Sequence, residues 1–433
     1  MKEYEANNIK NVAVVGHGGS GKTSLIEAML FKAGCTDRLG KIADGNTVSD
    51  YDAEEIKRRA SLNLSIVPVE FQGTKLNLLD APGLFDFALG MGEGIRAAES
   101  VLIAVSGKSG VTVGAKKAYK SALKQQKSRM IFVTKMDQEH ADFYKVLESL
   151  KTNFGPSICP LVVPYVRDSK VECYIDLVDM KAYTYKNGTR EEVPMPDSEH
   201  RLEGLVSAIS EAVAETDEAL FDKYFSGEKY THEEMIQGIH HGIVDGTITP
   251  VFCGSSLTLD GIDLMMESMI TMLPSAGEGK EEGVSGEDIV ELSCDPNAAP
   301  VAFVFKTIAD PFVGKLSYVK VICGKLVSDT ELINMTTGQP EKIGKILFVR
   351  GKKQEEIKEI KAGDICAISK LNANTGDTLC SSKNKVTLMK AEFPESCYLM
   401  TIRPIGKGDE SKISLGITRL LEEDPTLSFI IDK

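Results

Sequence analysis

The residues whose types and spacing could do chemistry begin near the N-terminus, where positions 16–23 read GHGGSGKT. This segment matches the phosphate-binding pattern G-x-x-x-x-G-K-[ST], whose glycines let backbone N–H groups turn toward phosphate oxygens. Lys22 would reach the β- and γ-phosphates, and the hydroxyl of Thr23 would ligate Mg²⁺. An apolar run at 12–15 precedes the loop and a helical pattern at 22–33 follows it, which is the context that the motif requires. We predict phosphate binding by His17, Gly18, Gly19, Ser20, Gly21, Lys22, Thr23 and Ser24.

A second motif, Asp80-Ala81-Pro82-Gly83, follows an apolar strand pattern. A carboxylate at this place would face Mg²⁺, usually through water, and the N–H of Gly83 can approach a γ-phosphate because glycine has no side chain in the way. Alone, D-x-x-G is more often a plain turn. Here the motif follows a phosphate loop and a hairpin signal at 72–74, and this order makes it a specific sign of nucleotide binding. We predict that Asp80 and Gly83 bind the nucleotide, that Lys22 and Gly83 are catalytic, and that Thr23 and Asp80 hold the metal.

A third motif, Thr134-Lys135-Met136-Asp137, follows another apolar strand pattern. An Asp carboxylate can accept hydrogen bonds from guanine N1–H and the 2-amino group together, a pair of donors that adenine lacks. The motif therefore predicts GTP rather than ATP. A weaker signal is Cys253-Gly254-Ser255-Ser256, where a backbone N–H could meet guanine O6. The residues predicted to surround the base are Thr134, Lys135, Asp137, Ser255 and Ser256.

Short apolar runs alternate with helical patterns in the first part of the chain, which predicts a mostly parallel sheet with helices on both faces. Strands are expected at 12–15, 64–71, 75–79, 101–105, 130–133, 161–163 and 249–252, and helices at 22–33, 114–126, 142–153 and 261–273. A block at about 160–248 interrupts this rhythm with a strand-like run at 174–185 and one long helical pattern at 199–225. We expect it to be an α+β subdomain inserted in a nucleotide-binding domain of residues 1–275.

The second part of the chain has a different composition. Seven acidic residues against one lysine mark 276–298 as a linker. Short strand-like runs with Gly and Asp turns predict a β-barrel at 299–388. Residues 394–433 then predict a partial α+β domain, with a strand at 398–403, a helix at 411–423 and the start of a strand at 428–431.

Composition narrows the possible partners and location. The 433 residues carry a net charge of −13, which excludes binding to nucleic acid through bulk positive charge, and we expect no sequence-specific nucleic-acid binding. The polar N-terminus and the absence of a long apolar run give no support to a membrane partner. Nine dispersed cysteines without a C-x-x-C pair predict reduced thiols and a cytoplasmic location. We expect a monomer.

Taken together, the motifs resemble those of translational GTPases, specifically elongation factor G and its paralogues. The resemblance also covers EEIKRRAS at 54–61, DAPGLFDF at 80–87, the barrel sequence at 301–326 and SLGITRLLEEDP at 414–425. It implies a P-loop GTPase domain with an inserted α+β subdomain, followed by a β-barrel and a partial ferredoxin-like α+β domain. It also implies GTP and GDP with Mg²⁺ as ligands, the ribosome as partner, and Ser61 as a further metal ligand in a switch segment at 45–61.

The sequence departs from the family pattern at Leu84, where the family usually has a His that positions the attacking water. An isobutyl group cannot orient water, so we expect normal GTP binding with hydrolysis ~10²–10⁴-fold slower than in a His-bearing relative. His17 or Asp86 could substitute for the missing His. Thr134 replaces an Asn of the base motif, and Gly19 replaces an Asp associated with a monovalent cation.

Three interpretations remain open from the sequence. The first is a GTP-hydrolysing translation factor that acts as a switch on the ribosome. The second is a GTP-binding switch module with negligible hydrolysis, which Leu84 favours. The third is another P-loop NTPase or a ribosome-protection-type factor. The half-built third domain further predicts a fragment that binds GTP without driving translocation.

Overall fold

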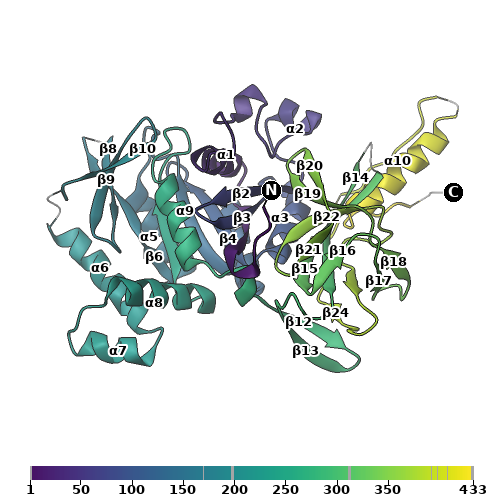
Figure 1. Ribbon diagram of the computed structural model, residues 1–433. Helices are drawn as coiled ribbons and strands as arrows, with labels where there is room; N and C mark the ends of the chain where they lie inside the picture. Colours follow the sequence, from purple (N-terminus) through teal and green to yellow (C-terminus); the bar gives the residue numbers. More distant parts are fainter. Residues whose placement is uncertain are drawn as a thin grey trace. The chain divides into compact units, whose positions relative to one another are not determined.

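The computed structural model describes residues 2–168, 170–196, 199–310, 314–391, 393–396, 398–406 and 408–430 (Figure 1). These residues form two compact units. We call residues 10–87 and 98–275 the α/β unit, and the described parts of 1–9, 88–97 and 276–433 the β-rich unit. None of the described helices is long and apolar enough to cross a bilayer.

A seven-stranded sheet forms the centre of the α/β unit, with strand order β2-β3-β1-β4-β5-β11-β6. The strands are β1 (Ile9–Val15), β2 (Ser65–Phe71), β3 (Thr74–Asp80), β4 (Ser100–Ser106), β5 (Ser128–Thr134), β6 (Ile158–Pro160) and β11 (Thr249–Cys253). β2 and β3 are an antiparallel hairpin, whereas β1, β4, β5, β11 and β6 pair in parallel. The carboxyl ends of the parallel strands therefore meet at one edge, where ligands bind in open α/β sheets.

Outside the insertion, the helices of this unit follow the predicted pattern closely, with the addition of the short helix α2. They are α1 (Lys22–Lys32), α2 (Ala53–Arg58), α4 (Val113–Lys124), α5 (Phe143–Phe154) and α9 (Ile262–Met272), with short 3₁₀ turns η2 (Ile42–Asp44) and η3 (Phe85–Phe87). Local caps fix several starts, because the side chains of Thr112 and Asp142 accept hydrogen bonds from backbone N–H groups in the first turns of α4 and α5.

The inserted subdomain is confirmed as α+β, but two of its elements differ from prediction. Its sheet has the order β10-β9-β8-β7, built from β7 (Val162–Arg167), β8 (Lys170–Asp176), β9 (Lys181–Lys186) and β10 (Thr189–Val193). The single strand expected at 174–185 is thus two strands with a turn between them. The strand expected at 161–163 begins one residue later, as β7 of the insertion, and Leu161 lies between it and β6 of the main sheet.

The long helix expected at 199–225 is two helices, α6 (Glu199–Ala214) and α7 (Glu218–Phe225), and α8 (His232–Asp245) follows. The break occurs because Asp217 caps α7, accepting from the N–H groups of Ala219 and Leu220. The start of α8 is a capping box between Thr231 and Glu234.

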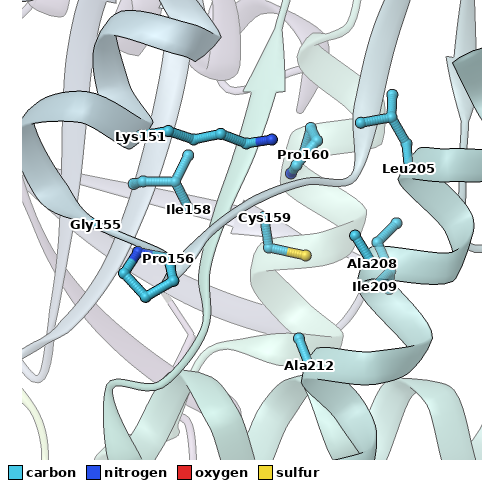
Figure 2. Close-up of a pocket in the computed structure, with 10 residues that line it drawn as sticks. All are labelled: Lys151, Gly155, Pro156, Ile158, Cys159, Pro160, Leu205, Ala208, Ile209 and Ala212. Atoms are coloured by element: carbon cyan, nitrogen blue, oxygen red, sulfur yellow. The ribbon is translucent and has the colours of Figure 1, made fainter.

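A cavity of about 430 Å³ lies where α6 faces the α5–β6 segment (Figure 2). Its lining is mostly aliphatic, with the side chains of Leu205 and Ile209 on α6 and of Ile158 on β6, beside Lys151 and Cys159. Burial raises the pKa of the Cys159 thiol to about 12, so this thiol stays protonated at neutral pH. The cavity contains none of the nucleotide motifs, and it marks an apolar seam between the insertion and the main sheet.

The β-rich unit has an eight-stranded antiparallel sheet with the order β18-β17-β23-β14-β15-β22-β19-β20. Its strands are β14 (Val301–Asp310), β15 (Gly314–Cys323), β17 (Glu331–Asn334), β18 (Pro340–Lys342), β19 (Ile346–Arg350), β20 (Lys353–Ile357), β22 (Ile365–Ser369) and β23 (Thr378–Cys380). A separate pair, β16 (Lys325–Val327) and β21 (Glu359–Lys361), packs on the same apolar core. The β-rich character predicted for this region is confirmed. The unit also contains η1 (Ala6–Asn8), α3 (Ala88–Ala97) and η4 (Ala276–Glu278), so α3 groups here although it falls inside the expected domain of 1–275.

The acidic segment expected as a linker is a β-hairpin. β12 (Lys280–Ser285) and β13 (Asp288–Ser293) pair antiparallel, and β24 (Thr387–Leu388) joins them. Gly286, with φ +65°, supplies the left-handed residue that the two-residue turn requires. Acidic side chains on the exposed faces do not prevent pairing, and Lys280 forms an ion pair with Glu291 across the hairpin.

At the C-terminal end the predicted helix is confirmed as α10 (Glu410–Glu423), but the predicted strand at 398–403 was wrong, since these residues are not in a strand. A strand needs a partner for its N–H and C=O groups, which a local sequence pattern does not supply. Residues 428–430 are likewise not in a strand, and Ile431 and Cys397 lie outside the described residues. The described third region is therefore a single helix with irregular flanks.

Candidate nucleotide-binding site

The predicted phosphate loop connects β1 to α1 at the carboxyl edge of the sheet. Three of its glycines have left-handed or related backbone angles, with φ +141° at Gly16, +76° at Gly19 and +99° at Gly21. A Cβ atom on Gly16 would lie 2.5 Å from the carbonyl oxygen of Ala104 on β4. The glycines are therefore needed both for the turn and for its close approach to the sheet.

Lys22 lies beneath this loop and is only 6% exposed. Its ammonium donates to the carbonyl oxygens of Gly16 and His17, each at 3.2 Å. Burial lowers the pKa of Lys22, while the nearby charges of Asp80 and Asp50 oppose that effect. The arrangement holds a cation at the place where phosphate charge is expected.

The three residues predicted as metal ligands come together from three separate segments. The Thr23 hydroxyl donates to Asp80 Oδ2 at 2.9 Å and lies 3.2 Å from the Ser61 hydroxyl. Asp80 is 1% exposed, and burial raises its pKa to about 6. Its Oδ1 is buried and has no hydrogen-bond partner among the residues that the structure describes. A buried carboxylate oxygen in need of a partner, beside two hydroxyls, fits the oxygen ligands that Mg²⁺ prefers.

Asp50 is a functional candidate that sequence reasoning missed. It is 5% exposed, and burial followed by the charge of Asp80 raises its pKa to about 6. The only sequence signal was its place within the expected switch segment at 45–61. In that segment α2 begins at the cap Asp52, and the Glu55 carboxylate accepts from the N–H groups of Leu62 and Asn63, which fixes the chain just after Ser61.

Gly83 and Leu84 lie against the phosphate loop. A Cβ atom on Gly83 would be 2.7 Å from the N atom of Gly18, so only glycine allows this approach. The Leu84 side chain is 42% exposed, and a Cβ atom on Gly18 would lie 2.8 Å from its Cδ2. Gly18 and Leu84 are thus matched in size, and an aliphatic group stands at the position where the sequence resemblance implies a His.

His17 and Asp86, the two residues proposed to orient water in place of the missing His, differ in their surroundings. The centre of the His17 ring lies 5.8 Å from that of Phe85, and its buried Nδ1 has no hydrogen-bond partner in the described part of the chain. The ammonium of Lys117 lies 4.2 Å from the centre of the Phe85 ring. Asp86 is exposed. The structure therefore gives His17 an apolar, crowded position beside the loop.

The predicted base-binding loops meet the phosphate loop through direct hydrogen bonds. Thr134 Oγ1 donates to the carbonyl oxygen of Ser20 at 2.6 Å, and Lys135 Nζ donates to that of Gly19 at 2.6 Å. The N–H of Met136 donates to the carbonyl oxygen of Gly254 at 3.1 Å, which joins the third motif to the fourth.

Within these base loops, the predicted contacts differ in exposure. Asp137 is exposed and Ser256 is half-buried. Ser255 is fully buried, and its hydroxyl accepts from the N–H groups of Leu257 and Thr258. Ser255 therefore shapes the loop with its side chain, and only its backbone is suited to meet a base.

All four motifs thus converge at one edge of the sheet, and together with the P-loop fold they define a nucleotide-binding protein of the P-loop class. The family model for the elongation factor Tu GTP binding domain matches residues 7–275, and that for elongation factor G domain 2 matches residues 299–382. The chain therefore belongs to the elongation factor Tu-type GTP-binding family, as an elongation factor G-like translational GTPase.

Several curated proteins and a solved structure are similar over most of the chain. Elongation factor G of Ureaplasma parvum serovar 3 is 32% identical over 429 residues, and that of Ureaplasma urealyticum serovar 10 is 31% identical. A crystal structure of a protein from Thermus thermophilus has 32% identity and a TM-score of 0.86. Each comparison covers 98% of this chain but 62% of the other protein, so the chain spans about 62% of the length of these relatives.

Proposed function

We propose that the chain binds GTP and GDP with Mg²⁺ and acts on the ribosome as an elongation factor G-like switch with weak intrinsic GTP hydrolysis. The observation that carries the weak hydrolysis is Leu84, whose aliphatic side chain packs over Gly18 beside the phosphate loop. The family match over 7–275 supports the guanine nucleotide, and the curated relatives support the ribosome as partner. A cytoplasmic location fits the eight described cysteines, all of which are free, and we further propose that the protein is a monomer.

In this proposal Thr23, Ser61 and Asp80 would hold Mg²⁺, which would supply positive charge to offset the charge of the phosphates. Lys22 and the N–H of Gly83 stabilise the charge that develops on the γ-phosphate while water attacks it. The site then supplies phosphate positioning and electrostatics but no side chain at position 84 to orient the water.

The second candidate is a GTP-binding switch module with negligible hydrolysis. The same Leu84 favours it, since a site that binds the phosphates well and orients water poorly retains GTP. The two candidates differ only in whether the ribosome restores turnover.

Single-turnover GTP hydrolysis with and without purified ribosomes tests both candidates. We expect slow hydrolysis by the wild type and a rate higher by ~10²-fold or more in Leu84→His, because a restored imidazole can orient water and Gly18 leaves room for it. Leu84→Met is the matched control, since it keeps an apolar side chain of similar size and should remain slow.

Fast hydrolysis by the isolated wild type with no gain in Leu84→His would contradict weak intrinsic catalysis. Turnover stimulated by ribosomes supports the translation-factor proposal, whereas tight GTP binding without any stimulation supports the switch module.

A further inference from the structure

The insertion reaches the base-binding part of the site through the turn between β9 and β10. This turn is Asn187-Gly188, with φ +51° and +76°, which is the left-handed pair that a tight two-residue hairpin requires. Gly188 is buried, and a Cβ atom on it would lie 2.8 Å from Cδ1 of Leu259. The backbone of the hairpin tip therefore packs directly on Leu259, which lies in the loop 253–260 that contains the fourth motif.

That loop has a conformation that its own sequence does not favour. Leu259 has φ +68°, an angle that is uncommon for a leucine, and its side chain is 7% exposed. The loop is closed by a hydrogen bond of 3.0 Å from the N–H of Ser255 to the carbonyl oxygen of Asp260. Such strained residues persist where surrounding structure holds them, and the Gly188 contact does so here.

The hairpin tip is also bound to the helix that begins at the phosphate loop. Lys32 is the last residue of α1, and its ammonium donates to the carbonyl oxygen of Gly188 at 2.8 Å. The same ammonium lies 3.4 Å from Asp263 Oδ2, in the first turn of α9. One lysine thus joins α1, the hairpin tip and the helix that follows the loop 253–260.

Both strands of the hairpin hold α9 as well. From β9, the Tyr185 hydroxyl donates to Asp263 Oδ1 at 2.6 Å, and burial and the Asp263 charge raise the pKa of Tyr185, so the phenol keeps its proton. From β10, Arg190 donates two hydrogen bonds to the Glu267 carboxylate, at 2.8 and 3.1 Å. Paired bonds of this kind fix geometry as well as distance.

We propose that these contacts form a positioning clamp through which the insertion holds the guanine-binding loop closed. The clamp consists of Lys32, Tyr185, Gly188 and Arg190 with their partners Leu259, Asp263 and Glu267. The inference rests on the proposed binding of guanine nucleotides and adds to it a role for the insertion in base affinity. The clamp contacts the loop 253–260 directly, but it touches α1 only at Lys32, at the end of the helix away from the phosphate loop. Loss of the clamp should therefore weaken the contacts to the base and leave the contacts to the phosphates unchanged.

The test compares GDP, which uses both halves of the site, with inorganic pyrophosphate, which uses the phosphate half alone. We expect the double variant Tyr185→Phe/Arg190→Gln to bind GDP about tenfold more weakly, since hydrogen bonds to charged partners are lost. Its pyrophosphate affinity should stay within about twofold of the wild type. Arg190→Lys should recover part of the GDP affinity, because it keeps the charge but not the paired bonds.

Lys186→Gln is the matched control on the same hairpin. It removes an exposed ion pair with Glu191, at 2.8 Å, without touching the clamp, and should leave both affinities unchanged. Thermal unfolding of each variant checks that it is folded. If the double variant does not fold, Tyr185→Phe alone removes one oxygen atom and should weaken GDP binding about threefold.

If Tyr185→Phe/Arg190→Gln, or Tyr185→Phe where the double variant does not fold, binds GDP within twofold of the wild-type affinity, the proposed clamp is wrong. An equal loss of pyrophosphate affinity would also overturn it, because it would show a general weakening of the α/β unit. A wild type that binds pyrophosphate but no guanine nucleotide would instead overturn the proposed function.

Discussion

At the phosphate end of the site the charged groups are buried, with Lys22 6% and Asp80 1% exposed, whereas Asp137 at the base end is exposed. The phosphate end is assembled from one strand–loop–helix segment, the two strands beside it and the segment 45–61 that carries Asp50 and Ser61. The base end consists of two loops held by hydrogen bonds to the phosphate loop and by contacts from an insertion. Phosphate binding is therefore expected to depend on buried electrostatics, and base selection on how loops are held in place.

The largest effect should come from removing the buried cation. Lys22→Ala is expected to weaken GDP and pyrophosphate binding alike, by about a hundredfold, because charge-assisted contacts to phosphate are lost. Isothermal titration with both ligands measures this, and Lys120→Ala, an exposed lysine on α4, is the control. A variant that keeps affinity within threefold of the wild type would show that the phosphate end does not depend on this charge.

A smaller effect should appear in stability when the buried carboxylates lack Mg²⁺ and nucleotide. The pKa of Asp50 is raised to about 6 from an ordinary 3.8. The folded protein therefore holds the Asp50 proton more tightly than the unfolded chain does, and the stability linked to this proton is fully present below pH 3.8 and is lost as pH rises through 6. Asp50→Asn should therefore stabilise the ligand-free protein by about 3 kcal/mol at pH 7.5, and this gain should disappear toward pH 4.

Urea unfolding at several pH values measures this difference, with the exposed Asp44→Asn of the same segment as control. If Asp50→Asn has no effect on stability at pH 7.5, or an effect that does not change with pH, then burial and the like charge of Asp80 do not destabilise an ionised Asp50.

The parts of the site that are local in the chain could be predicted from the sequence, and those assembled from distant segments could not. The phosphate loop is a local motif, so its residues, the flanking strand and α1 could be predicted from positions 12–33 alone. Asp50 could not, because it approaches Asp80 only after an irregular segment folds back. The contacts of Gly188 with Leu259 and Lys32 could not either, since they join residues far apart in the chain.

The errors in the fold have related causes. Composition records charge and not strand pairing, so it predicts a linker where the structure has the acidic hairpin β12–β13. The residues at 398–403 have the composition of a strand but no pairing partner among the described residues. The break between α6 and α7 is different, since the capping residue Asp217 was a local signal that apolar periodicity across the break concealed.

The guanine-nucleotide site is tested most directly by nucleotide selectivity at the base end, measured by titrating GTP and ATP into the wild type and Asp137→Asn with Mg²⁺ present. We expect the wild type to bind GTP and not ATP, and Asp137→Asn to lose GTP affinity by about tenfold or more, because the acceptor for both guanine donors is changed. Glu139→Gln, an exposed neighbour whose side chain is 88% accessible, should bind like the wild type. Equal binding of ATP and GTP by the wild type, or a selectivity that does not change in Asp137→Asn, would contradict the assignment of a guanine-nucleotide site.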